Sequence, residues 1–301
     1  MKLLILGGSG QLSGRVAELA LSQGHEVWTL TRGIRPVPAG VHALTADRED
    51  DAAVRAAMEC AGVHWDACID CTGRTARSAA QCVEIVSRWT ERYVVVSTDS
   101  VYDPHFKTVG QDESNEHYLT DGGYGANKRL MEEAFIASPL NYTIFRPGHI
   151  FGAGFQLGCY PEHTRQPDLL RQLRAGTPMR LVGGGAFLIH PVYVDDLALA
   201  LLDCIGNPAC FRQVFCIASP DAVTNAEYYR LIGRIIGCEV TVETIPLDGY
   251  LEAHPQYSGH LCHRCYDLTK LRNAGVRMPC MPLEEGLRGQ IAWLEGQEET
   301  V

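Results

Sequence analysis

Residues 3–14 read LLILGGSGQLSG, and this segment determines the architecture expected for the rest of the chain. An apolar run of four residues leads directly into glycines, and apolar residues then recur at helical spacing. A second apolar run occupies residues 26–30. A strand, a glycine turn, a helix and a second strand within about 30 residues are typical of the first βαβ unit of a parallel sheet.

The glycine turn also predicts a binding site. Glycines let the backbone approach a pyrophosphate, and the free N–H groups and positive end of the following helix hold its charge. A merely tight connection between a strand and a helix would not need this many glycines. We therefore expect a dinucleotide cofactor to bind at this turn, through Gly7, Ser9, Gly10, Gln11 and Leu12.

Strand and helix patterns alternate through the first half of the chain, which predicts an α/β fold with a doubly wound parallel sheet, a Rossmann fold. The strands are expected near residues 2–6, 26–30, 41–45, 66–71, 92–98 and 141–145, and the helices near 11–23, 50–61, 75–89 and 124–137. Residues 1–150 are assigned to the dinucleotide-binding domain. Residues 151–301 are assigned mainly to a smaller C-terminal α/β substrate lobe, with segments near 186–220 returning to the sheet.

The second half is less regular. A glycine-rich stretch beginning at Gly152 predicts a long functional loop over the substrate. Beyond it, helices are expected near residues 166–175, 193–205, 224–237, 267–274 and 282–296, and strands near 179–182 and 211–217.

Tyr124 and Lys128 are candidate catalytic residues because a spacing of four places a phenol and an ammonium one helical turn apart. A neighbouring cation favours the phenolate and so lowers the pKa of a tyrosine. The same spacing also occurs on solvated helix faces. A second feature supports the catalytic interpretation: the buried-strand pattern that begins at Val94 ends abruptly in hydroxyl residues, among them Thr98, and such strand ends are where open α/β sheets place ligands.

With these motifs, the chain resembles the extended (or atypical) short-chain dehydrogenase/reductase superfamily, which includes the NAD-dependent epimerases and dehydratases. The likeness includes the segments at 146–148, 192–197 and 267–271. It looks nearest to a branch with Arg after the second strand and Asp-Arg after the third, which includes chloroplast RNA-binding relatives. The resemblance implies a Thr98, Tyr124 and Lys128 active site, and cofactor contacts at Thr72, Gly73, Pro147, Ile150 and Lys128. Ser13 stands where relatives usually have a third glycine, which bears on how closely the helix packs.

The residue after the second strand distinguishes NADP(H) from NAD(H), since an acidic side chain there would repel a 2′-phosphate. Here it is Arg32, a planar cation suited to phosphate, with Thr31 and Ser9 as hydroxyl partners. NADP(H) is therefore favoured, although Arg32 could instead stack on adenine and accept both cofactors. Asp47 is expected at the adenine amino group, and Arg48 near the phosphate.

The substrate is expected to be a small polar molecule, sugar-like or otherwise. Nucleotide-sugar relatives hold a diphosphate with an arginine where this chain has Ile189, and a second such arginine has no match except the nearby Arg264. Asp99 could act on the substrate, as acidic groups do in related dehydratases, or could cap a turn. Candidates for the substrate side are His149, His163, Arg165 and His190, of which His149 is the strongest.

The composition of the chain limits its expected partners, location and metal content. The formal net charge of −10 argues against nucleic acid as the main partner. No apolar run approaches the length of a membrane span, and no signal peptide is recognised, so a cytoplasmic location without membrane association is expected. The 12 cysteines are expected to be reduced, and the Cys262–Cys265 pair lacks the second pair that a zinc site needs, so no metal is expected.

Three functions remain open from the sequence. The first is an NAD(P)-dependent oxidoreductase that moves a hydride to or from a carbonyl or alcohol carbon. The second is a nucleotide-sugar epimerase or dehydratase that retains its cofactor. The third is a catalytically inert NADP-binding regulator or RNA-associated protein on the same fold. The family resemblance also implies a homodimer.

Overall fold

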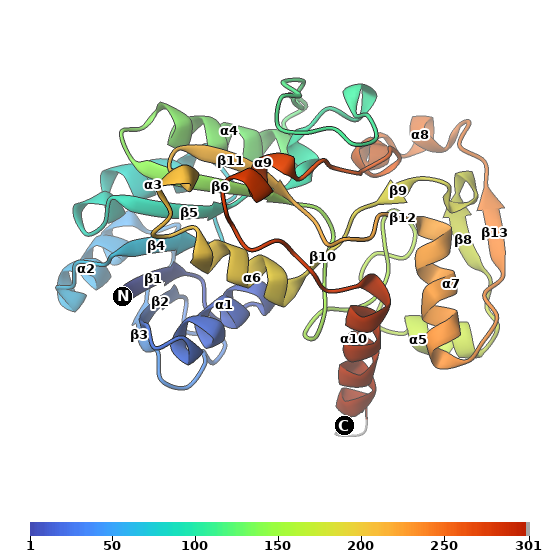
Figure 1. Ribbon diagram of the computed structural model, residues 1–301, viewed down its shortest axis with the longest axis horizontal. Helices are drawn as coiled ribbons and strands as arrows, with labels where there is room; N and C mark the ends of the chain where they lie inside the picture. Colours follow the sequence, from blue (N-terminus) through green and yellow to red (C-terminus); the bar gives the residue numbers. More distant parts are fainter. Residues whose placement is uncertain (299–301) are drawn as a thin grey trace.

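The computed structural model describes residues 1–298 and has a seven-stranded parallel sheet at its centre (Figure 1). The strand order is β11-β6-β5-β4-β1-β2-β3. The chain moves outward from β1 to β3, returns to β4 on the other side of β1, and continues outward to β11. The order therefore reverses between β1 and β4, and the crevice above their carboxyl ends is where folds of this kind bind ligands.

The strands of this sheet are β1 (Lys2–Leu6), β2 (Glu26–Thr31), β3 (His42–Thr45), β4 (Ala67–Asp70), β5 (Arg92–Val96), β6 (Asn141–Pro147) and β11 (Gln213–Ile217). The helices beside them are α1 (Gln11–Ser22), α2 (Asp51–Ala61), α3 (Ala76–Glu84), α4 (Tyr124–Ala137), α6 (Val194–Asp203) and α9 (Thr269–Asn273).

Alternate residues of each central strand bury opposite faces of the sheet, because strand side chains alternate. Leu3 and Ile5 of β1 pack with α1, α6 and α9. Leu4 and Leu6 pack with α2, α3 and α4. Both faces are thus covered by helices, which explains why these strands are apolar throughout rather than alternating with polar residues.

The second lobe lies beside the carboxyl ends of the strands (Figure 1). It contains the short strands β7 (Ile150–Phe151), β8 (Met179–Val182), β9 (Leu188–Ile189), β10 (Val192–Tyr193), β12 (Val223–Thr224) and β13 (Val242–Ile245). Its helices are α5 (Leu169–Arg174), α7 (Asn225–Ile236), α8 (Tyr250–Ala253) and α10 (Leu283–Glu298). Tyr228 and Tyr229 of α7 are fully buried in its separate core.

The doubly wound parallel sheet predicted from the sequence is confirmed, and α4 has the predicted bounds. The main difference lies in residues 75–89, where one helix was expected. The structure ends α3 at Glu84 and adds a short 3-10 helix at Val86–Arg88. Among the described residues, no helix has the length and apolar character required to cross a bilayer.

Candidate active site

The glycine turn after β1 brings the backbone close to β2. Gly7 and Gly8 have φ angles of 117° and 123°, which side-chain-bearing residues rarely adopt. A Cβ on Gly8 would also lie 2.5 Å from Cγ2 of Thr29. This turn therefore needs glycine for both conformation and space, as a cradle for a pyrophosphate does.

Ser13 occupies the position of the third glycine, and α1 still packs closely against the glycine turn. Its side chain is buried, and its Oγ accepts a hydrogen bond of 3.1 Å from the N–H of Gly10, the N-cap residue before α1. A Cβ on Gly14 would lie 3.4 Å from the carbonyl oxygen of Gly8, so the close approach occurs one residue later. The helix packs tightly, and its first N–H groups have no acceptor one turn earlier.

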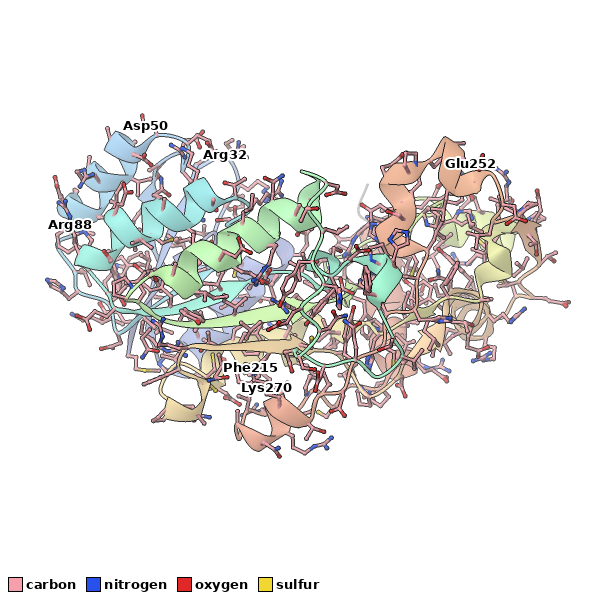
Figure 2. The ribbon with its side chains drawn as sticks, turned by 90° about the horizontal axis from the view of Figure 1, so that it is seen from above. Arg32, Asp50, Arg88, Phe215, Glu252 and Lys270 are labelled. Atoms are coloured by element: carbon pink, nitrogen blue, oxygen red, sulfur yellow. The ribbon has the colours of Figure 1, made fainter. Side chains whose placement is uncertain are left out.

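A cavity of about 410 Å³ lies beside this turn, at the carboxyl ends of β2 and β3. It contains most residues predicted to bind the cofactor: Gly7, Ser9, Gly10, Thr31, Arg32, Asp47, Arg48 and Thr72. Arg35 and Arg74 also line it and were not predicted. Arg32 and Arg35 are exposed and make no ion pair within residues 1–298. Figure 2 shows Arg32 on the part of the molecule that carries Asp50 and Arg88, away from Glu252 on the second lobe.

Arg48 was expected near a cofactor phosphate, and the structure assigns its charge to another partner. Its Nη1 donates to Oδ1 of Asp70 at 2.7 Å and to Oγ1 of Thr72 at 2.9 Å. Asp70 is fully buried, and the same oxygen accepts the N–H groups of Thr72 and Gly73. Although burial opposes its charge, Arg48 and these hydrogen bonds hold the pKa of Asp70 below its usual value. Arg48 therefore shapes the loop after β4.

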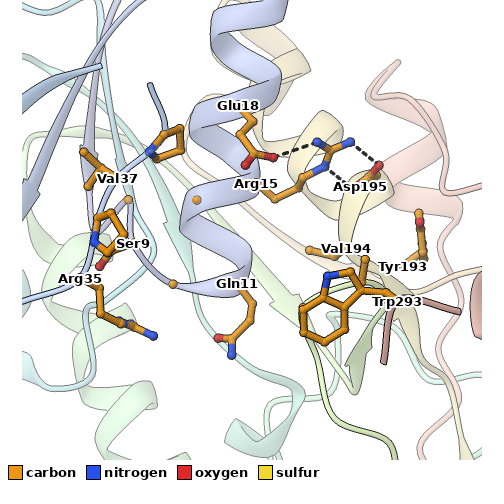
Figure 3. Close-up of a pocket in the computed structure, with 17 residues that line it drawn as sticks. Ser9, Gln11, Arg15, Glu18, Arg35, Val37, Tyr193, Val194, Asp195 and Trp293 are labelled. Atoms are coloured by element: carbon orange, nitrogen blue, oxygen red, sulfur yellow. Dashed lines mark hydrogen bonds and ion pairs between the residues drawn. The ribbon is translucent and has the colours of Figure 1, made fainter. Parts of the chain in front are cut away.

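A second cavity, of about 750 Å³, opens on the other side of the glycine turn (Figure 3). Gln11 lies at its centre, between Arg35 and Trp293. Arg15 is bound on both sides, by Asp195 at 2.6 Å and by Glu18 at 2.9 Å. Leu12, also predicted to bind cofactor, packs its side chain against the core, so only its backbone N–H is available at the helix start.

A third cavity, of about 570 Å³, brings together predicted residues from distant parts of the chain. Thr98 and Asp99 follow β5, and Tyr124 begins α4. Pro147 ends β6, His149 lies between β6 and β7, and Ile150 begins β7. Arg74 lines both this cavity and the one beside β2 and β3, so the two adjoin. The remaining polar side chains in the lining are Ser97, Ser100, Tyr160, Thr164, Arg165, His260 and Arg264.

The approach of Tyr124 to Thr98 depends on the glycine that follows the tyrosine. A Cβ on Gly125 would lie 2.0 Å from the carbonyl oxygen of Ser100, so only glycine lets α4 start this close to the turn after β5. Thr98 begins that turn, and its Oγ1 accepts the N–H of Ser100 at 3.2 Å. The close contact at Gly125 therefore positions the Tyr124 hydroxyl at the cavity, and the hydrogen bond to Ser100 positions the Thr98 hydroxyl.

Tyr124 is 56% exposed and lines the cavity. Burial raises the pKa of Tyr124, and the nearby Arg74 guanidinium and the hydrogen-bonding Thr98 hydroxyl oppose that rise. The sequence analysis expected a lowered pKa caused by Lys128. In the structure, the cation with the largest effect on the phenol is Arg74, and the net direction is upward.

Lys128 is 4% exposed and lies one turn further into α4. Its Nζ donates to the carbonyl oxygens of Gly73 at 2.6 Å and Val96 at 2.7 Å. Burial lowers the pKa of Lys128 to about 8, against the attraction of Asp70 and Glu132. The ammonium thus joins the ends of β4 and β5, with Gly73 as the predicted cofactor-side residue it contacts.

Asp99 is 1% exposed and has fixed partners. Its Oδ2 accepts the Tyr266 hydroxyl at 2.8 Å and lies 3.7 Å from Nη1 of Arg264. Burial opposes its charge, but Arg264, Lys107 and Tyr266 hold the pKa of Asp99 below the usual value. Thr98 caps the turn here, so Asp99 is not needed as its cap. An ionised, paired carboxylate is a poor proton donor, but Asp99 lines the cavity, and a role on the substrate stays a prediction.

The candidate histidines separate into two groups. His149 lines the cavity, and burial holds its pKa well below the usual value, so the ring is neutral. His190 was predicted on the substrate side, but Nε2 contacts the Ser219 carbonyl at 2.8 Å and Nδ1 accepts the Tyr266 N–H at 3.2 Å. His163 likewise uses Nδ1 on Gln166 and Nε2 on the backbone of Arg180. Both are structural and lie outside the cavity lining.

Sequence reasoning missed several cavity residues. Arg74 and Tyr160 lie on loops, His260 ends a short 3-10 helix at Pro255–His260, and Arg264 was noted only for its position near a family arginine. The one available signal was that Arg74 directly follows the predicted cofactor residues Thr72 and Gly73. Within residues 1–298, no group of three or more His, Cys, Asp or Glu side chains is arranged to hold a metal ion.

The sheet, the glycine cradle and the adjoining cavities define a dinucleotide-dependent enzyme of the short-chain dehydrogenase/reductase type. The sequence profile of the NAD dependent epimerase/dehydratase family matches residues 3–218. This chain belongs to that family.

Two curated relatives are similar in sequence. The chloroplast stem-loop binding protein of 41 kDa b from Arabidopsis thaliana is 25% identical over 244 residues, which are 74% of this chain and 60% of that protein. The 2′-dehydrokanamycin reductase of Streptomyces kanamyceticus is 26% identical over 262 residues, 82% of this chain and 70% of the reductase. The chain thus spans about three fifths of the first relative's length.

Solved structures share the fold across nearly the whole chain. The UDP-glucose 4-epimerase of Thermotoga maritima, solved with UDP-glucose, has a TM-score of 0.81 at 17% identity and covers 99% of this chain and 100% of its own. The UDP-glucose 4-epimerase of Thermus thermophilus, solved with NAD, has a TM-score of 0.79 at 19% identity, with coverage of 98% and 99%. At these identities the likeness describes architecture only.

Proposed function

We propose that this protein is an NAD(P)-dependent oxidoreductase that moves a hydride to or from a carbonyl or alcohol carbon of a small polar substrate. The observation that carries the proposal is the meeting of Thr98 and Tyr124 in one cavity that adjoins the glycine cradle through Arg74. Lys128 is buried behind the cavity lining, and its Nζ donates to the carbonyl oxygens of Gly73 and Val96.

The three side chains divide the work on the substrate oxygen. A nicotinamide cofactor, when bound, supplies or accepts the hydride at the carbon. In the reducing direction, Tyr124 donates its hydroxyl proton to the oxygen while Thr98 donates a hydrogen bond to the same atom. Hydride and proton together convert a carbonyl into an alcohol. Loss of this proton converts Tyr124 into a phenolate, which the positive charges of Lys128 and Arg74 stabilise. A proton from solvent then restores the Tyr124 hydroxyl.

Tyr124→Phe tests the assignment directly. A screen of sugars, nucleotide sugars and small ketones with NADPH and NADH first identifies a substrate, through the loss of cofactor absorbance. We expect the variant to lose about 100- to 10,000-fold in kcat, because the proton donor is removed. NADPH affinity, measured by fluorescence titration, should change little. Unchanged turnover in Tyr124→Phe would remove the assignment, and Tyr118→Phe, a nearby tyrosine outside the cavity lining, serves as the matched control.

We further propose that NADP(H) is preferred over NAD(H). Arg32 follows β2, and Arg35 lies on the same cavity, with its Nη2 3.9 Å from the Cβ position of Gly10. Neither is paired within residues 1–298, whereas Arg48 is neutralised by Asp70. Two available guanidinium groups suit a 2′-phosphate, which accepts paired hydrogen bonds from arginine.

An epimerase with retained cofactor is the second candidate, favoured by the match of residues 3–218 to the NAD dependent epimerase/dehydratase family. The two functions differ in cofactor balance. An epimerase would copurify with its cofactor and show no net change in cofactor absorbance during turnover. An oxidoreductase would consume added NADPH in proportion to product.

RNA association is the third candidate, because one relative is a chloroplast stem-loop binding protein. We propose instead a small-molecule partner and no nucleic acid, supported by the formal net charge of −10. A homodimer is proposed from family resemblance and is tested by sedimentation. Salt-sensitive binding of a stem-loop RNA, together with an inert Tyr124, would favour the third candidate over the first.

A further inference from the structure

The cavity beside Tyr124 is electropositive. Its lining contains three arginines, Arg74, Arg165 and Arg264, and one carboxylate, Asp99. Both histidines of the lining are neutral, because burial holds the pKa of His149 well below its usual value and that of His260 at about 3. Three positive charges against one negative charge leave an excess of two positive charges.

Two of these arginines have donors with no partner. Nη1 of Arg165 and Nε of Arg264 are buried and make no hydrogen bond within the described residues. Arg264 is 7% exposed and meets Asp99 through its Nη1 alone, at 3.7 Å. A buried guanidinium with unused donors is costly unless an acceptor satisfies them.

The histidines leave matching atoms unpaired. Nε2 of His149 and Nδ1 of His260 are also buried without a partner. A neutral imidazole carries one N–H, which either nitrogen can hold, so each ring can donate to a ligand. His149, His260, Arg165 and Arg264 all line the same cavity, so the four side chains surround one volume.

The fold holds Arg165 in an unfavourable backbone conformation at this place. Its φ is 47°, which is uncommon for a residue other than glycine. Its guanidinium carbon lies 4.6 Å from the Phe155 ring centroid, and Nη2 donates to the Ile150 carbonyl at 3.0 Å. Strain of this kind persists where the surroundings over-determine it, often at ligand sites.

We propose that the substrate carries an anionic group, a carboxylate or a phosphate monoester, close to the reacting carbon, and that Arg165 and Arg264 bind it with help from His149 and His260. This inference rests on the proposed function, since it assigns the substrate class of that same cavity. Planar guanidinium groups bind both anions through paired hydrogen bonds, and the group would neutralise the excess positive charge.

A set of matched sugars tests the proposal without turnover. The 301-residue protein, loaded with NADP⁺, is titrated calorimetrically with glucose, glucuronate, glucose 6-phosphate, glucosamine and UDP. We expect an acidic sugar to bind at least about 10-fold tighter than glucose, and glucosamine to bind weakest, because charged hydrogen bonds are stronger than neutral ones. Preference for glucuronate identifies a carboxylate, and preference for glucose 6-phosphate identifies a phosphate.

Two variants locate the anion. Arg165→Asn removes the charge with a residue that tolerates a positive φ, and Arg264→Lys keeps a cation beside Asp99 but loses the planar fork. Each should lose most of the preference for the acidic sugar while NADP⁺ still binds. Arg171→Asn, an exposed arginine on α5, is the matched control and should keep it.

Equal binding of the acidic and neutral sugars would overturn the proposal, as would binding of UDP alone or a preference that survives in both variants. These outcomes leave the proposed function intact, because that function is judged by the effect of Tyr124→Phe on turnover. If the unmodified protein failed to bind NADP⁺, that result would instead count against the proposed function.

Discussion

Lys128 is a residue whose charge changes within the range of ordinary buffers. Burial lowers its pKa from 10.5 to about 8 in the folded protein. Between these values the unfolded chain holds a proton that the folded protein has released, so stability rises with pH in this window. Below about pH 8 the full cost of the buried ammonium remains. We expect the free energy of unfolding to gain at most about 3 kcal/mol from this residue between pH about 8 and 10.5.

Urea unfolding of the wild type and of Lys128→Met across that range measures the effect. The difference between the two proteins isolates Lys128 from the cysteines and tyrosines that titrate in the same range. The wild type should gain stability relative to Lys128→Met as pH rises. Lys2→Met, which changes an exposed lysine, should show no such trend. A constant difference between wild type and Lys128→Met would contradict the lowered pKa.

At the scale of an element, the start of α4 depends on a close contact. A methyl group on Gly125 would lie 2.0 Å from the carbonyl oxygen of Ser100 and 2.8 Å from its carbon, both of them backbone atoms. Gly125→Ala must therefore push α4 away from the turn that carries Thr98. We expect a loss of about 1–3 kcal/mol in stability, as for other overpacked sites, and a fall in kcat as Tyr124 moves.

Gly289→Ala in α10 is the matched control, because apart from its chain neighbours and the backbone of its own helix no described atom lies within 4 Å of the added methyl. It should be neutral or should stabilise the helix by up to about 1 kcal/mol. Chemical unfolding measures the stability of both variants, and steady-state kinetics measures their kcat. A Gly125→Ala protein as stable and active as the wild type would show that the two elements can separate without consequence.

Helices and strands could be predicted from the sequence where apolar residues recur at a regular spacing. The contacts of individual side chains could not be predicted. The periodicity of residues 124–137 gave α4 its bounds, and the run ending at Thr98 placed a hydroxyl at a strand end. Arg74 and His260 could not be predicted, because they reach the cavity through loops separated by long stretches of chain. The partners of His190 and Arg48 could not be predicted either, since only the fold brings Tyr266 and Asp70 to them.

At the scale of the whole molecule, cofactor choice should appear as a difference in global stability. A ligand that binds only the folded state stabilises it by an amount that grows with its concentration over Kd, about 2.7 kcal/mol at 100 times Kd. NADPH and NADH differ by the 2′-phosphate that Arg32 and Arg35 are proposed to bind. We expect NADPH to raise the thermal unfolding temperature more than an equal concentration of NADH.

Arg32→Ser should reduce that difference between the two cofactors. Arg88→Ser, which changes an exposed arginine away from Arg32 on the same lobe, should preserve it (Figure 2). Equal shifts from the two cofactors in the wild type would show that Arg32 does not select the phosphate.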